Sequence, residues 1–168
     1  MITVYFDGLC EPVNPGGIAA YGFVAYKDGE RIAAGKGIVG AGYRGDDVTN
    51  NVAEYTALIR ALEWLVANGY AGGKLVVKGD SQLVIRQLQG RYAVRSARIP
   101  PLYRRAVELL SHFPRRRYVW IPRERNWEAD ALSLEALREY LREHPEALSA
   151  YSERRWRAFA RARGLEKL

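Results

Sequence analysis

The chain has 168 residues, of which 48% are hydrophobic and 27% charged, a composition that excludes wholesale disorder and is typical of one globular domain. Its net charge of +7 is uneven: residues 1–80 carry 7 basic and 9 acidic side chains, whereas residues 81–168 carry 19 and 10. An acidic half joined to a basic half favours a polyanionic partner, although a solvated basic surface would have the same composition.

Cysteine content and hydropathy point to the compartment. The single cysteine, Cys10, excludes an intrachain disulfide and indicates a reducing environment. No stretch reaches the roughly 18 apolar residues of a membrane span, and the N-terminus lacks the pattern of a secretion signal. We therefore expect a soluble, cytoplasmic protein, a monomer without a membrane partner.

Strands are predicted first in chain order. Residues 2–8 alternate between apolar and polar side chains, and a tight-turn signal at Asp28-Gly29 divides the next apolar run, residues 19–40, into two strands. Residues 1–40 are therefore predicted to form a three-stranded antiparallel meander.

Helices and strands alternate after the meander. The predicted elements are a helix over 51–68, a strand over 74–80, helices over 81–90 and 100–113, a strand over 115–122 and a helix over 126–141. This order indicates a mixed α/β domain over residues 1–144. Pro145 separates it from a C-terminal extension, residues 145–168, predicted to contain one basic amphipathic helix over about 146–163.

Four acidic residues stand near the ends of predicted elements. Asp7 closes the first strand and Asp80 the fourth, while Glu54 and Asp130 lie in the first turns of two helices. Because parallel strands open their carboxyl ends toward one crevice, we expect these carboxylates to meet there. Oxygen ligands suit Mg²⁺ or Mn²⁺, and two such ions roughly 4 Å apart can stabilise both the attacking and the leaving oxygen of a phosphodiester displacement.

Each carboxylate also has an ordinary structural alternative. Glu54 or Asp130 would interact favourably with a helix dipole, Asp80 could cap the helix that follows it, and Asp7 could be a turn residue. Four such positions in one basic protein favour the metal site, but spacing alone does not establish that they meet.

The segments around these residues resemble the archaeal type of type 1 ribonuclease H. The matching segments cover about residues 1–140: YFDGLCEPVNPGGIAAYGFV, TNNVAEYTALIRAL, KGDSQLVIRQLQGRY, RIPPLYRRAVELL and IPRERNWEADALS. The resemblance implies an α/β ribonuclease H-like fold with a five-stranded mixed sheet in the order 3-2-1-4-5, flanked by helices. It implies two-metal hydrolysis of the RNA strand of an RNA/DNA hybrid to 5′-phosphate and 3′-hydroxyl ends. The implied catalytic and metal-binding residues are Asp7, Glu54, Asp80 and Asp130, with two Mg²⁺ or Mn²⁺ ions as cofactors.

Substrate-binding positions follow from the same resemblance. Asn14, Asn50 and Asn51 match places where the family contacts 2′-hydroxyls and base edges, which suits amides because they both donate and accept hydrogen bonds. Asn14 could instead be a turn residue. Thr49 matches a phosphate contact, but it could equally cap the first long helix.

The loop before Asp130 departs from many relatives, which carry a catalytic histidine there. The only histidines here are His112 and His144, and Arg123 occupies the loop. Arginine stays protonated and cannot shuttle a proton, but as a catalytic residue it could stabilise phosphate charge or the departing product. A structural salt bridge is the alternative role for Arg123.

The C-terminal extension combines an apolar stripe, Leu148, Tyr151, Trp156 and Phe159, with Arg154, Arg157 and Arg161 opposite. A helix docked on the core, nucleic-acid contact through the arginines, and a membrane-surface helix all share this pattern.

Two function classes follow: a hybrid-cleaving enzyme, or a catalytically silent nucleic-acid-binding module. The complete set of four carboxylates favours the enzyme. Double-stranded RNA stays open as a second substrate, because it shares A-form geometry and 2′-hydroxyls with the hybrid.

Overall fold

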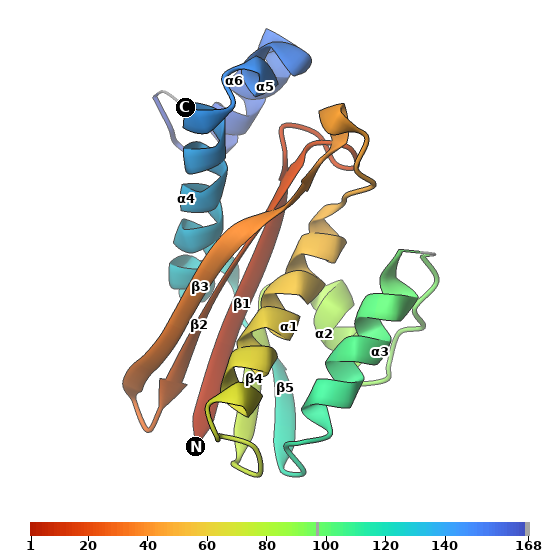
Figure 1. Ribbon diagram of the computed structural model, residues 1–168, viewed down its shortest axis with the longest axis vertical. Helices are drawn as coiled ribbons and strands as arrows, with labels where there is room; N and C mark the ends of the chain where they lie inside the picture. The colour runs from red at the N-terminus through yellow and green to blue at the C-terminus, as the bar shows by residue number, and fades with distance from the viewer. Residues whose placement is uncertain (97, 167–168) are drawn as a thin grey trace.

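A five-stranded mixed sheet forms the centre of the computed structural model, which describes residues 1–96 and 98–166. Its strands are β1 (Ile2–Glu11), β2 (Ile18–Lys27), β3 (Glu30–Ala41), β4 (Leu75–Gly79) and β5 (Arg116–Trp120), in the order β3-β2-β1-β4-β5 (Figure 1). Neighbours among β1, β2 and β3 pair antiparallel, whereas β4 pairs parallel with both β1 and β5. The predicted meander and strand order are confirmed.

The turn between β2 and β3 is also as predicted. Asp28 and Gly29 have φ angles of 49° and 84°, so both residues adopt the left-handed conformation. Such a two-residue turn has the twist that lets antiparallel strands pair directly, which is why Asp-Gly favours it.

Six helices are present in the described residues: α1 (Asn50–Ala67), α2 (Gln82–Leu88), α3 (Ile99–Leu110), α4 (Trp127–Glu143), α5 (Glu146–Ala150) and α6 (Glu153–Ala162). Thr49 caps α1, its hydroxyl accepting from the Val52 amide at 3.1 Å. Ser81 caps α2 in the same way through the Val84 amide at 3.2 Å. The capping role proposed for Asp80 is therefore taken by its neighbour.

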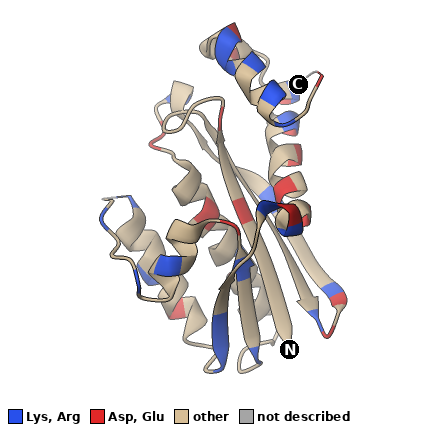
Figure 2. Cartoon of the chain, turned by 180° about the vertical axis from the view of Figure 1, so that it is seen from behind, with Lys and Arg blue, Asp and Glu red and all other residues tan. Residues whose placement is uncertain are grey.

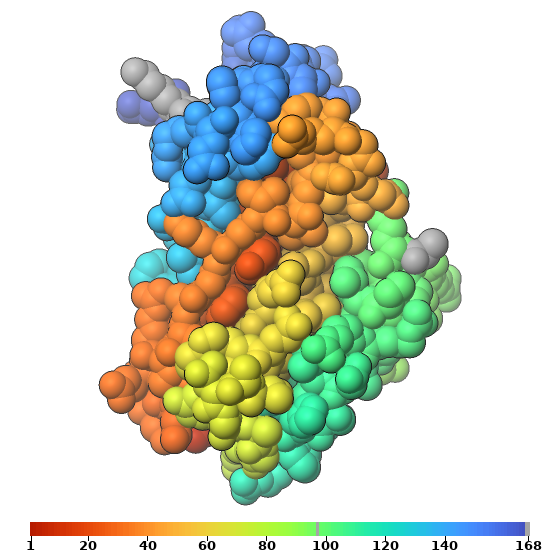
Figure 3. Space-filling model, in the orientation of Figure 1, coloured from red at the N-terminus to blue at the C-terminus, as the bar shows by residue number. Residues whose placement is uncertain are grey.

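The two faces of β1 pack against different helices. Val4 and Phe6 belong to an apolar cluster with residues of α1 and α3, whereas Leu9 belongs to a second cluster that includes Leu137 of α4 and Trp156 of α6. Figure 3 shows α1 and α3 side by side over the first face. The central strand is thus covered on both sides. Within the described residues, no helix combines the length and apolar character needed to cross a bilayer.

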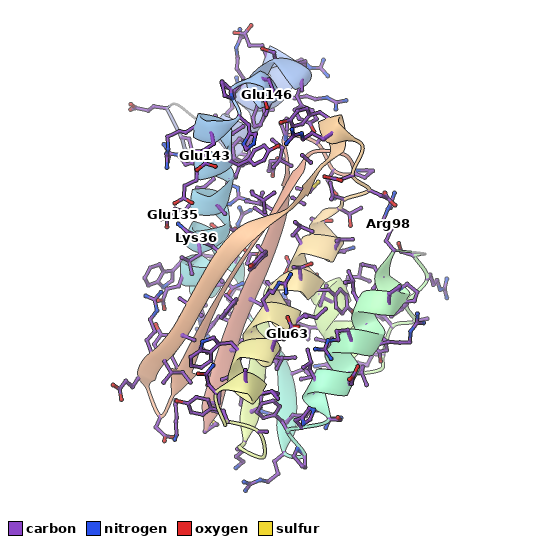
Figure 4. All side chains as sticks on the ribbon, viewed as in Figure 1. Lys36, Glu63, Arg98, Glu135, Glu143 and Glu146 are labelled. Atoms are coloured by element: carbon purple, nitrogen blue, oxygen red, sulfur yellow. The ribbon has the colours of Figure 1, made fainter. Side chains whose placement is uncertain are left out.

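An ion-pair cluster fastens α4 to β3. The Lys36 ammonium lies 2.6 Å from Glu135 Oε1 and 2.7 Å from Glu139 Oε1, and Figure 4 shows Lys36 and Glu135 beside each other. These exposed pairs contribute modestly to stability, because water screens them.

The C-terminal extension differs from the single predicted helix. Tyr151 is extended, with φ −125° and ψ 153°, and separates α5 from α6. Ser152 then caps α6 by accepting from the Arg155 amide at 3.2 Å, a local bond that competes with a continuous helix. Trp156 and Phe159 are buried as the docked alternative requires, but Leu148 is 40% exposed and lies outside that stripe.

Gly8 tests the packing of α1 on β1. An added Cβ would overlap the backbone of Ala53 and Glu54, so we expect Gly8→Ala to lower the free energy of unfolding by about 1–3 kcal/mol. Urea denaturation would measure the loss. Gly73→Ala is the matched control, because its Cβ would lie 3.2 Å from the Tyr70 oxygen and 3.4 Å from Ile2 Cδ1, contacts that a small shift relieves, and should change stability by less than about 1 kcal/mol. Equal stability of the Gly8→Ala protein and the wild type would contradict this close approach.

Candidate active site

Asp7 lies within β1 and not at its end. The strand continues to Glu11, and Asp7 is paired with Gly22 of β2. The prediction that Asp7 closes the strand is wrong, and so is the alternative of a turn residue. The strand extends because Leu9 and Cys10 continue the buried pattern beyond Gly8. Asp7 is consequently a carboxylate held in the middle of the sheet, with only 6% of its surface exposed.

Glu54 lies in the second turn of α1. The helix begins at Asn50, so the prediction that Glu54 stands in the first turn is wrong, and a helix-dipole role loses its basis. Gly8 has no side chain, which lets the backbone of α1 approach β1 at this point. Glu54 reaches Asp7 across this contact.

Three of the four predicted carboxylates converge. Asp7, Glu54 and Asp80, which follows β4 directly, each offer an oxygen, and the three oxygens lie within 4.8 Å of one another. Oε2 of Glu54 is buried without a hydrogen-bond partner among the described residues. A buried acceptor without a partner, in a set of oxygen donors only, fits a hard divalent cation.

The charge of this cluster is poorly compensated. Burial raises the pKa of Asp7 well above its usual range, and the charges of Asp80 and Asp130 raise it further. Burial likewise raises the pKa of Glu54, with added repulsion from Asp7 and Asp80. Without a cation, these two side chains therefore lose their protons at a higher pH than free carboxyls do.

Asn126 supports the cluster and was not among the predicted site residues. Its buried amide nitrogen donates to the Phe6 carbonyl and to Oδ1 of Asp80, both at 2.9 Å. It thereby fixes the Asp80 carboxylate relative to β1. Its position before α4 suggests a helix cap, but its side chain makes no capping bond, so no local signal indicates this role.

Asp130 occupies the first turn of α4, as predicted, but it is paired with arginine. Its Oδ1 accepts from Nη1 of Arg163 at 2.7 Å and lies 4.0 Å from Nη2 of Arg123. Arg163, which follows α6, was also not among the predicted residues. The salt bridge suggested for Arg123 is long, and its side chain is 59% exposed.

The carboxylates and the two arginines border one cavity of about 280 Å³, which Asn126 does not line. Its lining includes the four carboxylates, both arginines, Asn14 and Asn50. Figure 2 shows acidic segments on neighbouring strands and helices in the middle of the molecule, with basic segments among them and toward the margins. The cavity therefore combines carboxylates with two guanidinium groups.

The predicted asparagines are joined to one another. Asn14 Nδ2 donates to Asn50 Oδ1 at 2.8 Å, and the backbone N–H of Asn50 donates to Asn14 Oδ1 at 3.0 Å. The backbone N–H of Asn51 donates to the same Asn50 Oδ1 at 2.9 Å. These bonds fasten the loop after β1 to the start of α1, and both Asn14 and Asn50 face the cavity.

Comparison with known families gives a consistent result. A model described as "Reverse transcriptase-like" matches residues 17–136. A protein named Ribonuclease HI from Halobacterium salinarum is 38% identical over 136 residues, which make up 81% of this chain and 64% of that protein. A bifunctional protein of Mycobacterium tuberculosis is 37% identical over 74% of this chain and 32% of its own length. The chain thus spans less than two thirds of either curated relative.

Solved structures show the same similarity. The crystal structure of RNase H1 from Halobacterium salinarum has a TM-score of 0.71 and 37% identity, covering 82% of this chain and 98% of that one. LC11-RNase H1, solved in complex with an RNA/DNA hybrid, has a TM-score of 0.75 and 34% identity, covering 84% and 99%.

The raised pKa values predict how stability depends on pH. The metal-free folded protein binds more protons than the unfolded chain above about pH 4, so its stability should fall as the pH rises through the raised pKa values. Glu54→Gln removes one of these charges and should raise the melting temperature of the metal-free protein at pH 7 by several degrees. Thermal melts in EDTA between pH 4 and 8 would measure both effects. A Glu54→Gln protein that melts below the wild type throughout this range would contradict the assignment.

Proposed function

The chain belongs to the type 1 ribonuclease H family, and we propose that it is a metal-dependent endoribonuclease that hydrolyses the RNA strand of RNA/DNA hybrids. The products would carry 5′-phosphate and 3′-hydroxyl ends. The observation that carries the proposal is the convergence of the Asp7, Glu54 and Asp80 oxygens within 4.8 Å, with Asp130 lining the same cavity.

Asp7, Glu54, Asp80 and Asp130 would hold two Mg²⁺ or Mn²⁺ ions. When bound, such ions activate the attacking water and stabilise the leaving 3′-oxygen. The protein's contribution is to fix the ligands: β1 holds Asp7, α1 brings in Glu54 over Gly8, and Asn126 orients Asp80. The raised pKa values of Asp7 and Glu54 support the proposal, because a cation in place of the retained protons relieves their mutual repulsion.

The hybrid would lie against the side of the cavity where Asn14 and Asn50 meet. Their side-chain amides, with Asn51 and Thr49 next to them, can exchange hydrogen bonds with 2′-hydroxyls and with phosphates. The contacts with 2′-hydroxyls would distinguish RNA from DNA. The hybrid complex of LC11-RNase H1, 34% identical to this chain, supports this substrate class. The four carboxylates favour an enzyme over a silent binding module.

Arg123 would act on the phosphate. Its guanidinium lines the cavity, is 59% exposed and makes only a 4.0 Å contact with Asp130, so it is free to bind a phosphate oxygen. A cation at this place stabilises the charge of the phosphoryl group and of the departing 5′-phosphate.

Asp7→Asn and Asp80→Asn should each lower the rate of hybrid cleavage by more than about 100-fold, because the shape is kept while a metal ligand is lost. Labelled hybrid, double-stranded RNA and double-stranded DNA, each incubated with Mg²⁺ or Mn²⁺, would be analysed on denaturing gels. Glu30→Gln, an exposed carboxylate at the start of β3, is the control and should cleave as the wild type does. Near-normal turnover by either aspartate variant would refute the metal assignment, and cleavage of double-stranded RNA alone would refute the substrate.

Arg123→Ala should lower kcat about 10-fold or more while leaving hybrid affinity nearly unchanged, because the proposed contact strengthens as charge develops. Arg125→Ala is the matched control: it lies two residues along and borders a different cavity with Tyr5 and Tyr26. Single-turnover rates and equilibrium binding in Ca²⁺ would separate the two quantities. An unchanged kcat with a lower melting temperature would assign Arg123 a structural role instead.

A further inference from the structure

The C-terminal extension places an arginine side chain, Arg163, in the carboxylate cavity. Arg163 follows α6 directly, and its Nη1 lies 2.7 Å from Oδ1 of Asp130. Its side chain is only 11% exposed, whereas those of Arg157 and Arg123 are 67% and 59% exposed. Of these arginines, Arg163 is the most buried and lies closest to Asp130, from which it is 33 residues away along the chain.

The surrounding packing fixes Arg163 in this place. Its guanidinium carbon lies 5.8 Å from the ring centre of Phe159, which is buried together with Trp156 in the cluster shared with α4 and β1. The Tyr151 hydroxyl donates to the Gly16 carbonyl at 2.8 Å and accepts from the Tyr43 amide at 3.1 Å. Figure 1 shows α5 and α6 at the same end of the molecule as the upper end of α4. The extension is therefore built into the core, and Arg163 is held by it.

A guanidinium on Asp130 affects the two proposed metal positions differently. Asp7, Glu54 and Asp80 form a three-carboxylate group that does not include Asp130. An ion held by that group keeps its ligands whether or not Arg163 is present. An ion that needs Asp130 must share this carboxylate with the Arg163 guanidinium. The pair is partly buried, with side chains 11% and 26% exposed, so solvent screens their attraction less than it screens a surface pair.

We propose that Arg163 is a counter-ion of the metal centre: it competes with one of the two divalent ions for Asp130 and so weakens that ion's binding more than it weakens binding of the ion at Asp7, Glu54 and Asp80, whose ligands it does not contact. This inference rests on the proposed function. The C-terminal extension would thus set the concentration of metal at which the centre fills. The alternative, in which Arg163 orients Asp130 toward the metal, predicts the opposite change in affinity.

Titration calorimetry with Mn²⁺ on the complete, substrate-free chain tests the proposal. The wild type should bind one ion more tightly than the other. In Arg163→Gln the weaker ion should bind about fivefold more tightly, or become detectable if it is too weak in the wild type, while the affinity of the tighter ion changes by a smaller factor. Arg163→Lys keeps the charge and should stay close to the wild type. Arg161→Gln is the matched control, because it makes the same charge change at an exposed residue of α6.

The outcomes separate the two proposals. Wild-type protein that binds no Mn²⁺ would refute the metal centre and with it the proposed function. Mn²⁺ binding that is unchanged or weaker in Arg163→Gln would overturn competition by Arg163 and leave the metal centre standing. The same gain in Arg161→Gln would show a general effect of net charge, and would also overturn it. Melting curves of each variant would confirm that affinities are compared between folded proteins.

Discussion

Repulsion between carboxylates held close together inside the protein is the constraint on which the structure of this site depends. Asp7, Glu54 and Asp80 present oxygens within 4.8 Å of one another, and both Asp7 and Glu54 are nearly inaccessible to water. Such a cluster opposes folding unless protons or cations neutralise it. The described residues supply few compensating groups: the Asn126 amide beside Asp80, and the arginines beside Asp130. The remaining negative charge makes the cavity suitable for divalent cations.

The fold brings this charge together through its central strand. β1 is paired on both edges and covered on both faces, so Asp7 cannot move away from the helices around it. α1 approaches over Gly8 from one face, and α4 brings Asp130 on the other. The C-terminal extension closes on the same region and adds Arg163. Stability and function are therefore coupled here, because the contacts that pack the helices also set the distances between charges.

Local sequence patterns predicted the element order of the core and the Asp28-Gly29 turn, because periodicity and turn chemistry depend on near neighbours. The same patterns drew attention to the four carboxylates, although Asp7 and Glu54 lie elsewhere in their elements than predicted. Contacts between distant residues were not predictable in this way. Asn126 and its partner Phe6 are 120 residues apart, and nothing in the sequence near Arg163 indicates a contact with Asp130. The position of Asp7 was misjudged because β1 continues through Gly8, and the C-terminal helix was predicted as continuous although Ser152 starts a second one.

The central claim is that the carboxylate cluster is a divalent-metal centre. A crystal structure of the protein soaked in Mn²⁺, with anomalous data collected near the manganese absorption edge, tests it most directly. We expect anomalous density bonded to oxygens of Asp7, Glu54 and Asp80, and a second peak that includes Asp130. A well-ordered cluster with water alone between these carboxylates, at millimolar Mn²⁺ and neutral pH, would contradict the account.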